Sequence, residues 1–516
     1  MKTTILFLAG LVTCAAAYAQ TPDDALRSSW FIPGGSARSV ATGGAMGSLG
    51  GDISANNVNP AGIGLYKTKE IVISPGFYFN NNKANYRDSS TATKKSAFSY
   101  GPIGFILGSP AGRNSKWTST AFSISVTQLA SYNNHVSYHG YNNMSSGSEQ
   151  YIEELVRDNA DSTAAENNYI NGSSLAYRTF LIDTWYDNSG KFIGYKSLVP
   201  IGSGGGVYQN YDEDTRGGYH EASIAFAGNM ADKLYIGGSV NVPIVSYNRD
   251  MTYRETDATG NTNNNFAYYE YSEKFKSSGV GLNAKLGLIY KPKEFIRLGF
   301  AFHTPSIISF KDELRAYMTT NTEGYVSGSV RKSSTEELNS GNPATRQYTQ
   351  LTPWRAIVSG SYVFREVENT KRQRAFLTAD IEYVNYRGTR YYASGEGSDD
   401  SGAKSYYDAT NNAIKDYLGS AFNFRLGGEI KFDPWMFRLG GAYYGSPYSD
   451  KELKAHRIMA SGGIGYRAHG MFIDLTYSYT MNKDVNFPYR LNDKPNTFAD
   501  VTNNRSNVVL TVGFKI

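Results

Sequence analysis

The segment MFIDLTYSYT, residues 471–480, decides the fold class of this 516-residue chain. Leu475 and Tyr477 fall on one side of an extended chain and Asp474 and Thr476 on the other, because successive side chains of a β-strand point to opposite faces. Such a strand has one apolar and one polar face. It fits a soluble β-sandwich, whose polar face meets solvent, or a membrane barrel, whose polar face meets the lumen.

The same alternation recurs along the chain in fourteen candidate strands. They cover residues 70–80, 96–108, 116–129, 219–228, 232–248, 266–291, 295–318, 343–366, 374–393, 420–431, 435–445, 455–467, 471–482 and 506–516. An even number of strands is typical of single-chain outer-membrane barrels. Links that follow even-numbered strands are short, such as DP at 433–434, whereas the long links, including 130–218, follow odd-numbered strands. We therefore predict an all-β fold, a 14-stranded antiparallel transmembrane β-barrel with both termini on the periplasmic side.

The N-terminus predicts export. Lys2 precedes an apolar run from Ile5 to Ala17, and the residues AYA at 17–19 have the small-x-small form of a signal-peptidase site. We therefore predict a signal peptide at residues 1–19. The only cysteine is Cys14, and a lipid-attachment role for it is the alternative. The mature chain then has no cysteine for a disulfide, so it must be stabilised in another way.

The composition favours a barrel over a large soluble domain. Aromatic residues make up 14%, with 41 Tyr and 26 Phe, and charged residues only 19%. The net charge of +5 is small for this length, and no Lys/Arg cluster predicts a nucleic-acid surface.

The last eleven residues, SNVVLTVGFKI, agree with the barrel prediction. Val508, Leu510, Val512 and Phe514 share one face up to the chain end. Outer-membrane proteins commonly end in such a strand with a terminal aromatic residue, so the barrel assembly machinery is an expected partner. Ile516 departs from that pattern. A soluble edge strand is the alternative for this stretch taken alone.

The segment before the first strand, residues 20–69, predicts a hatch inside the lumen. A barrel of fourteen strands would leave an open channel. The stretch GGDISANNVNPAGIG, residues 50–64, is rich in Gly and Asn, which permit the turns of an irregular path. A disordered leader is the alternative. Its apolar residues, including Val40, Met46, Leu49 and Ile53, argue against that alternative.

The motif GSARSVATGGAMGSLGGDISANNVNPAGIGLYKTKE, residues 35–70, resembles the N-terminal signature of the FadL/TodX-type outer-membrane transporters. The matching residues are Arg38, Gly43, Gly44, Ala45, Asp52, Asn59, Pro60, Ala61 and Gly62. The resemblance implies a monomeric barrel, residues 70–516, in the outer membrane of a Gram-negative bacterium. It also implies a hatch carrying the N-P-A motif and diffusion of hydrophobic molecules, such as long-chain fatty acids or aromatic hydrocarbons. Some relatives carry a hemin-receptor label.

Charged residues at inward positions of the alternation predict an ion-pair network in the lumen. Its members include Arg297, Arg425, Arg438, Glu429 and Asp474, with Arg355, Asp380 and Glu382. Asp52 of the motif is a candidate partner for one of these arginines. A purely structural role for the motif and a gating role stay open.

The long link 130–218 is the candidate ligand-capturing insertion. SEQYIEELVRD predicts a short helix with Tyr151, Ile152 and Leu155 on one side, and Phe180 and Leu181 lie in a second apolar segment. Together they predict an apolar external vestibule. The alternative is that they only pack the loop onto itself. The FadL/TodX-type family usually has its external loops later in the barrel, which puts a transfer of its binding site in doubt.

Enzymatic and metal sites are not predicted. The sequence has no G-x-S-x-G or H-E-x-x-H motif and no phosphate-binding loop, and we expect no catalytic residues, cofactor or metal. His135 and His139 are the only close histidine pair, but on an extended segment positions i and i+4 lie ~13 Å apart, too far to ligate one iron.

The sequence thus favours a passive outer-membrane transporter for hydrophobic small molecules, with outer-membrane lipids around it. A surface receptor that binds hemin or another ligand without transport is the main alternative, and a structural or adhesive barrel is a third. Lateral exit through the wall is implied by the resemblance alone. Gly101-Pro102 is a position where strand pairing would be interrupted.

Overall fold

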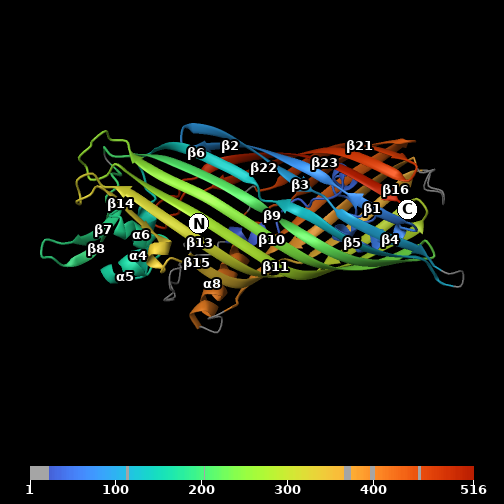
Figure 1. Cartoon of the computed structure of the whole chain (residues 1–516), viewed down its shortest axis with the longest axis horizontal. Helices are drawn as coiled ribbons and strands as arrows, with labels where there is room; N and C mark the ends of the chain where they lie inside the picture. The colour runs from blue at the N-terminus through green and yellow to red at the C-terminus, as the bar shows by residue number, and fades with distance from the viewer. Residues whose placement is uncertain (1–21, 112–114, 203, 365–373, 396–400, 451–454) are drawn as a thin grey trace, which may run out of the picture.

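A computed structural model describes residues 22–111, 115–202, 204–364, 374–395, 401–450 and 455–516. The predicted signal peptide, residues 1–19, lies outside these ranges. The described chain forms a long β-barrel of tilted strands, with short helices inside it and towards one end (Figure 1). None of the helices in these ranges is long and apolar enough to cross a bilayer.

Within the described ranges, fourteen antiparallel strands build the wall, and six of them are interrupted into two segments. In chain order they are β1 with β2 (Lys69–Ile73, Pro75–Tyr86), β3 with β4 (Ser89–Tyr100, Ile103–Pro110), β5 with β6 (Trp117–Ser131, Asn134–Asn142), β9 (Val207–Met230), β10 (Leu234–Asp257), β11 (Tyr268–Lys293), β12 with β13 (Ile296–His303, Ile307–Asn321), β15 with β16 (Ala344–Leu351, Arg355–Phe364), β17 with β18 (Ala375–Asn385, Arg390–Ala393), β19 (Ser420–Phe432), β20 (Trp435–Tyr444), β21 (Arg457–Ala468), β22 (Met471–Asn486) and β23 (Ala499–Lys515).

The barrel is closed between its first and last strands. β1 pairs with β23 in the register Ile71↔Phe514, and β2 pairs with the same strand in the register Phe77↔Val508. The fold class and strand number predicted from the sequence are confirmed.

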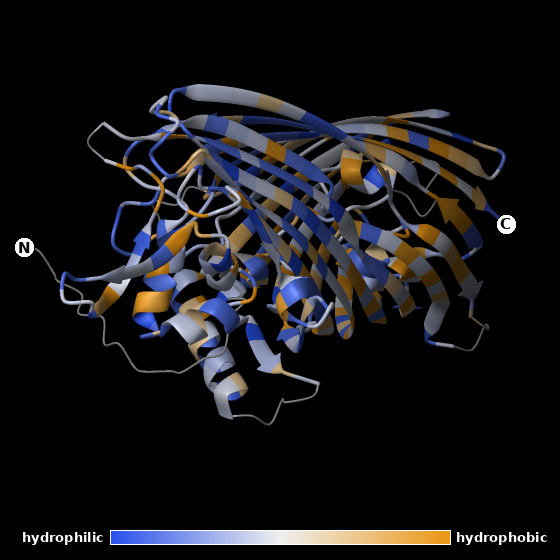
Figure 2. Ribbon diagram, turned by 60° about the vertical axis from the view of Figure 1, so that its left-hand side comes forward, coloured by the Kyte–Doolittle hydropathy of each residue, from blue (hydrophilic) through white to orange (hydrophobic). Residues whose placement is uncertain are grey.

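The predicted alternation is present in the structure. On β22, Leu475 and Tyr477 are 46% and 51% exposed, whereas Thr476 between them is 1% exposed. Figure 2 shows hydrophobic and hydrophilic residues alternating along the strands. The apolar side chains therefore form an outer belt suited to lipid, and the polar ones line the lumen.

Aromatic side chains mark the edges of this belt. Phe302, Trp354, Tyr383 and Phe422 follow one another around the extracellular edge, with ring centroids 5.9, 5.3 and 5.2 Å apart, and we call them the outer girdle. Trp435 and Tyr466 form a similar pair, 5.0 Å apart, near the periplasmic end. Aromatic girdles at both interfaces are typical of outer-membrane barrels.

The segment before β1 fills the lower lumen, and we call residues 22–66 the hatch. It contains α1 (Pro22–Arg27), α2 (Ala37–Ala41), α3 (Ala55–Val58) and the 3-10 helix η1 (Pro60–Leu65). Most of its side chains are buried, and they contact inward-facing residues of wall strands around the barrel. Gly43 and Gly44, with φ of 68° and 77°, turn the chain after α2 in a conformation that favours glycine.

The extracellular end carries the remaining elements. These are α4 (Glu149–Arg157), α5 (Ser162–Asn167), α6 (Ser173–Arg178), the hairpin of β7 (Ile182–Tyr186) and β8 (Phe192–Ser197), β14 (Val330–Ser334), α7 (Thr335–Leu338), the 3-10 helix η3 (Tyr386–Gly388) and α8 (Ser401–Tyr417). The hairpin and the helices α4 to α6 project from this end (Figure 1).

The sequence prediction of an external loop over the whole range 130–218 is wrong at both ends. β6 and the first half of β9 lie in this range and pair with each other, for example Val136↔Glu213. In the first half of β9, the consecutive acids Asp212, Glu213 and Asp214 put polar residues on both faces, so the apolar alternation that marks a strand is missing there.

Candidate functional site

Wall glycines hold the hatch against the barrel. A Cβ on Gly237 would lie 2.6 Å from backbone atoms of Pro60 and Ala61 of the hatch. Other wall glycines on which a Cβ would collide with the hatch include Gly101 (against Gly35), Gly287 (against Asn59), Gly299 (against Gly47), Gly427 (against Thr42) and Gly440 (against Gly43). We call these six the glycine seat. Because only glycine allows so close a backbone approach, the hatch lies directly on the strands.

Asparagines of the N-P-A region add polar contacts between hatch and wall. The Asn59 side chain accepts a hydrogen bond from Ala61 N (3.1 Å) and donates to the carbonyls of Gly47, Leu288 and Phe300. Asn57 donates to Glu221 on β9 at 2.8 Å. Pro60, Ala61 and Gly62 of the motif are fully buried in η1, which contacts β9, β10 and β11.

The predicted pairing of Asp52 with Arg297, Arg425 or Arg438 is wrong. Asp52 accepts hydrogen bonds from the Ser36 hydroxyl (2.8 Å) and from Ser54 N (2.9 Å), both within the hatch. The Asp52 carboxylate thus stabilises a turn within the hatch, because short polar side chains readily bond to nearby backbone groups.

The predicted lumen charges are buried except for the partly exposed Arg355, and the structure sorts them into separate groups. Arg438 donates to Glu429 at 2.6 Å and to Asp474 at 2.7 Å. Arg38 of the hatch reaches the same Glu429 carboxylate at 3.3 Å. The periplasmic half of the lumen is therefore bridged from wall to hatch by charge-assisted hydrogen bonds.

The other predicted charges lie at different heights: Arg425 is farther from the periplasmic turns than Arg438, whereas Arg297 follows directly after the periplasmic turn between β11 and β12. Arg425 pairs with Glu382, and Arg297 donates to the carbonyl of Leu49 at 2.8 Å. The sequence reasoning missed a further buried pair, Lys285 with Glu221. This pair could have been predicted from the sequence, because both residues occupy inward positions of the alternation in their strands.

A small cavity separates hatch and wall at this level. Its volume is about 60 Å³, and its lining includes Phe31 and Val58 of the hatch and Lys285, His303 and Glu382 of the wall. An apolar cavity that binds benzene is roughly 150 Å³. A single aromatic ring therefore does not fit this cavity unless the hatch or the lining side chains move.

The wall has a seam between β3 and β6. Among the described residues, β3 forms a backbone ladder with β2 and β6 with β9, and no ladder joins β3 to β6. Below the seam the same two wall strands are paired through β4 and β5, starting at Ile103↔Val126. The wall strand made of β3 and β4 is interrupted at Gly101-Pro102, the position at which the sequence suggested interrupted pairing.

Side chains close the seam instead of backbone. Thr93 donates to the carbonyl of His135 (2.5 Å), and His139 contacts Ser89 (3.0 Å) and Thr91 (3.3 Å). The two histidines thus lie on an extended strand and bond to neighbouring groups. Within the described ranges, no cluster of three or more His, Cys, Asp or Glu side chains is placed to hold a metal ion.

The hatch reaches the base of the seam. Gly34 N donates to the carbonyl of Leu129 (2.9 Å) on β5, and Gly35 lies against Gly101 at the end of β3. The outward residues beside this base, Ile103 and Val126, are 42% and 39% exposed and belong to the apolar belt. One loop of the hatch therefore contacts both sides of the closed seam, beside outward residues of the apolar belt.

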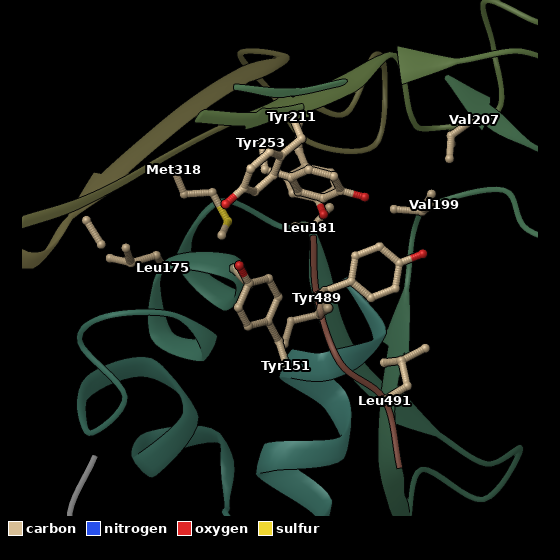
Figure 3. Close-up of a cluster of buried hydrophobic side chains, with 14 of the residues drawn as sticks. Tyr151, Leu175, Leu181, Val199, Val207, Tyr211, Tyr253, Met318, Tyr489 and Leu491 are labelled. Carbon is tan, nitrogen blue, oxygen red and sulfur yellow. The ribbon is translucent and has the colours of Figure 1, made fainter. Parts of the chain in front are cut away.

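The extracellular end is closed by an aromatic cluster that we call the cap (Figure 3). Three of the predicted ligand residues, Tyr151, Leu155 and Leu181, are buried in it, and Ile152 packs at its edge. Phe180 lies outside it, with its ring 6.3 Å from that of Tyr325. These residues pack the cap instead of forming the predicted open vestibule, because inward tyrosines of the tall strands β9 to β11 cover them.

The centre of the cap is a carboxylate that sequence reasoning did not single out. Glu255 on β10 is fully buried and accepts hydrogen bonds from Gly147 N and from the Gln209 side chain, both at 2.8 Å, and from Ser146 and Tyr253. It fixes the loop before α4 to the wall. Nothing in the local sequence distinguishes this residue from the exposed acids around it.

Comparisons with known proteins agree with this geometry at the level of the fold. No protein-family model and no curated relative matches the sequence. The structure of a FadL homologue from Pseudomonas aeruginosa is similar over 94% of this chain and 98% of that protein, with 14% identity and a TM-score of 0.55. The P. putida toluene transporter TodX is similar over 94% of this chain and 99% of that protein, with 12% identity and a TM-score of 0.51. This chain therefore has the barrel fold of the FadL/TodX-type outer-membrane transporters.

Proposed function

We propose that this protein is an outer-membrane channel for passive uptake of hydrophobic small molecules. The observation that carries the proposal is that one hatch loop, Gly34 and Gly35, contacts both sides of the seam. Among the described residues, no backbone ladder joins the two strands at the seam, which lies at the edge of the apolar belt. A ligand that displaces this loop gains a lateral path from the lumen into lipid. The likeness to a FadL homologue and a toluene transporter supports the same class of ligand.

The chemistry of the route fits an apolar ligand that needs no energy source. The hatch contacts wall strands around the lumen, and the cavity between hatch and wall beside Lys285 and His303 is only about 60 Å³, so free diffusion of water-soluble molecules is opposed. A hydrophobic molecule gains favourable free energy by leaving water for lipid, at about 25 cal/mol per Å² of apolar surface. Long-chain fatty acids and monoaromatic hydrocarbons are both within the proposed ligand class, and we expect the protein to act as a monomer.

A disulfide across the seam tests the route. Thr93→Cys with His135→Cys joins the two strands where the Thr93 hydroxyl already contacts the His135 carbonyl. In liposomes, we expect the oxidised variant to lose at least about tenfold in uptake rate of labelled fatty acid and of toluene, and reduction to restore it. The matched control is Ile224→Cys with Val240→Cys, an outward pair within a complete ladder, and we expect its oxidation to leave uptake unchanged.

Two results would contradict the proposal in different ways. Unchanged uptake by a fully oxidised seam variant would reject the lateral route. Absence of uptake by the folded wild-type barrel, despite ligand binding, would favour a receptor that does not transport.

A further inference from the structure

The wall has unequal height around the barrel. β9, β10 and β11 have 24, 24 and 26 residues, whereas β19, β20 and β21 have only 13, 10 and 12. The three short strands end near the outer girdle, because Ser420, Tyr444 and Arg457 are their last extracellular residues. Between β18 and the taller β22 the described chain therefore leaves a gap in the wall, which we call the notch.

Helix α8 covers the notch from outside. Figure 1 shows this helix projecting from the side of the barrel near β15, and it packs against β18. In the described ranges, β18 pairs with β15 alone, so its other edge lacks a strand. The Asn411 side chain replaces that strand: it accepts a hydrogen bond from Tyr391 N (2.8 Å) and donates to Tyr391 O (2.9 Å). A side chain that satisfies both backbone groups protects an otherwise free edge.

Behind α8 lies the N-terminal part of the hatch, which it contacts directly. Tyr407, Ile414 and Leu418 of the α8 region share one buried cluster with Ala25 and Leu26 of α1. The helices α1 and α8 contact each other directly. A continuous buried apolar cluster thus connects α8 with the N-terminal part of the hatch.

The outer face of α8 has a different chemistry. Lys404, Asp408, Asn412 and Asp416 are exposed, so this face suits water and lipid headgroups, not hydrocarbon. The notch begins at the outer girdle, the level at which headgroups meet the apolar belt. The seam is closed by polar contacts of Thr, Ser, His and Asn side chains, whereas the notch is closed by the apolar cluster behind α8.

We propose that α8 is the movable cover of a second lateral opening, through which apolar molecules gathered at the headgroup level of the outer leaflet enter the lumen beside α1. The seam then serves as the exit into hydrocarbon. The ligand class rests on the proposed function, whereas the opening itself is independent of it. Asn411 holds the cover closed, and the cluster around Tyr407 and Ile414 is what the entering molecule replaces.

Cysteine labelling measures the opening without any transport assay. In a Cys14→Ser background, Ala25→Cys places one thiol behind α8 at a fully buried position. Asn411→Ala removes both hydrogen bonds to Tyr391, and we expect a water-soluble maleimide added outside proteoliposomes to react with this introduced thiol about tenfold faster. Asn412→Ala, on the exposed face of the same helix, is the matched control, and we expect it to leave the rate unchanged.

A second variant and a second reporter keep the test decisive. Ile414→Ala loosens α8 through packing and covers the case in which Asn411→Ala fails to fold, as judged by heat-modifiable mobility. Ala37→Cys reports on a fully buried part of the hatch that packs on β22 and β23. Unchanged labelling of Ala25→Cys in the folded variants, or an equal increase at Ala37→Cys, overturns the opening. Neither result depends on whether the protein transports a ligand.

Discussion

The hatch and the cap close the same barrel by different physical means. The hatch lies on the glycine seat and is joined to the wall by asparagine and arginine hydrogen bonds. The cap is an aromatic core around one buried carboxylate, Glu255. Directional contacts fix a position closely yet can be exchanged one by one, whereas a packed core resists change as a unit. We therefore expect the hatch to reorganise locally and the cap to stay closed unless its centre is removed.

The largest effect is expected from filling the glycine seat. Gly287→Val places side-chain atoms where Asn59 now lies, and overpacking of this kind costs about 3 kcal/mol at its upper end. Hydrogen exchange should show lost protection in the hatch and unchanged protection in the cap, with a higher single-channel conductance. The control is Gly360→Val on β16, where an added Cβ meets nothing within 4 Å. Equal loss in hatch and cap would show that the two regions are one cooperative unit.

A smaller effect, confined to the cap, is expected from Glu255→Ala. The change leaves the buried Gly147 N–H without its acceptor and removes one of three acceptors of the Gln209 amide, at a cost of about 2 kcal/mol. Amides of residues 144–148 should exchange faster while those of the hatch stay protected. Glu270→Ala is the control, because Glu270 forms a half-exposed pair with Arg254 at 3.2 Å. If residues 144–148 keep their protection in the Glu255 variant, aromatic packing alone holds the cap.

The smallest effect is expected at Asn59. Asn59→Ala removes the N-capping hydrogen bond of η1 and the contacts with the carbonyls of Leu288 and Phe300. We expect it to lower the free energy of hatch opening by about 1–2 kcal/mol. Asn59→Ser retains a capping hydroxyl but cannot reach these carbonyls, so it should recover part of the loss. Exchange rates of the hatch amides measure both. Full recovery by serine would assign Asn59 a local capping role with no part in holding the wall.

Local sequence pattern was sufficient for the wall and insufficient for what fills it. Leu475 and Asp474 could be assigned to opposite faces because a strand has a strict period of two. β6 was missed because its apolar side chains, Val136 and Tyr138, face inward into the cap and its outward residues are mostly polar, the reverse of the alternation used to find the wall strands. Tyr151 and Leu155 could be placed on one side of a helix, but only the tall strands opposite decide that this side is buried. Gly287 looked like any other strand glycine, because its role depends on Asn59, more than two hundred residues away in sequence.

By itself, the sequence determined the barrel class, the number of strands, the inward and outward faces and the presence of an N-terminal motif. These properties follow from short-range periodicity and from motif residues that are close together in the chain. Only the tertiary structure decided which backbone edges have no partner strand among the described residues, at β3 and at β18, and which side chains contact them. The physical reason is that an unpaired edge is a relation between distant segments, set by how far each wall strand rises and by what packs beside it.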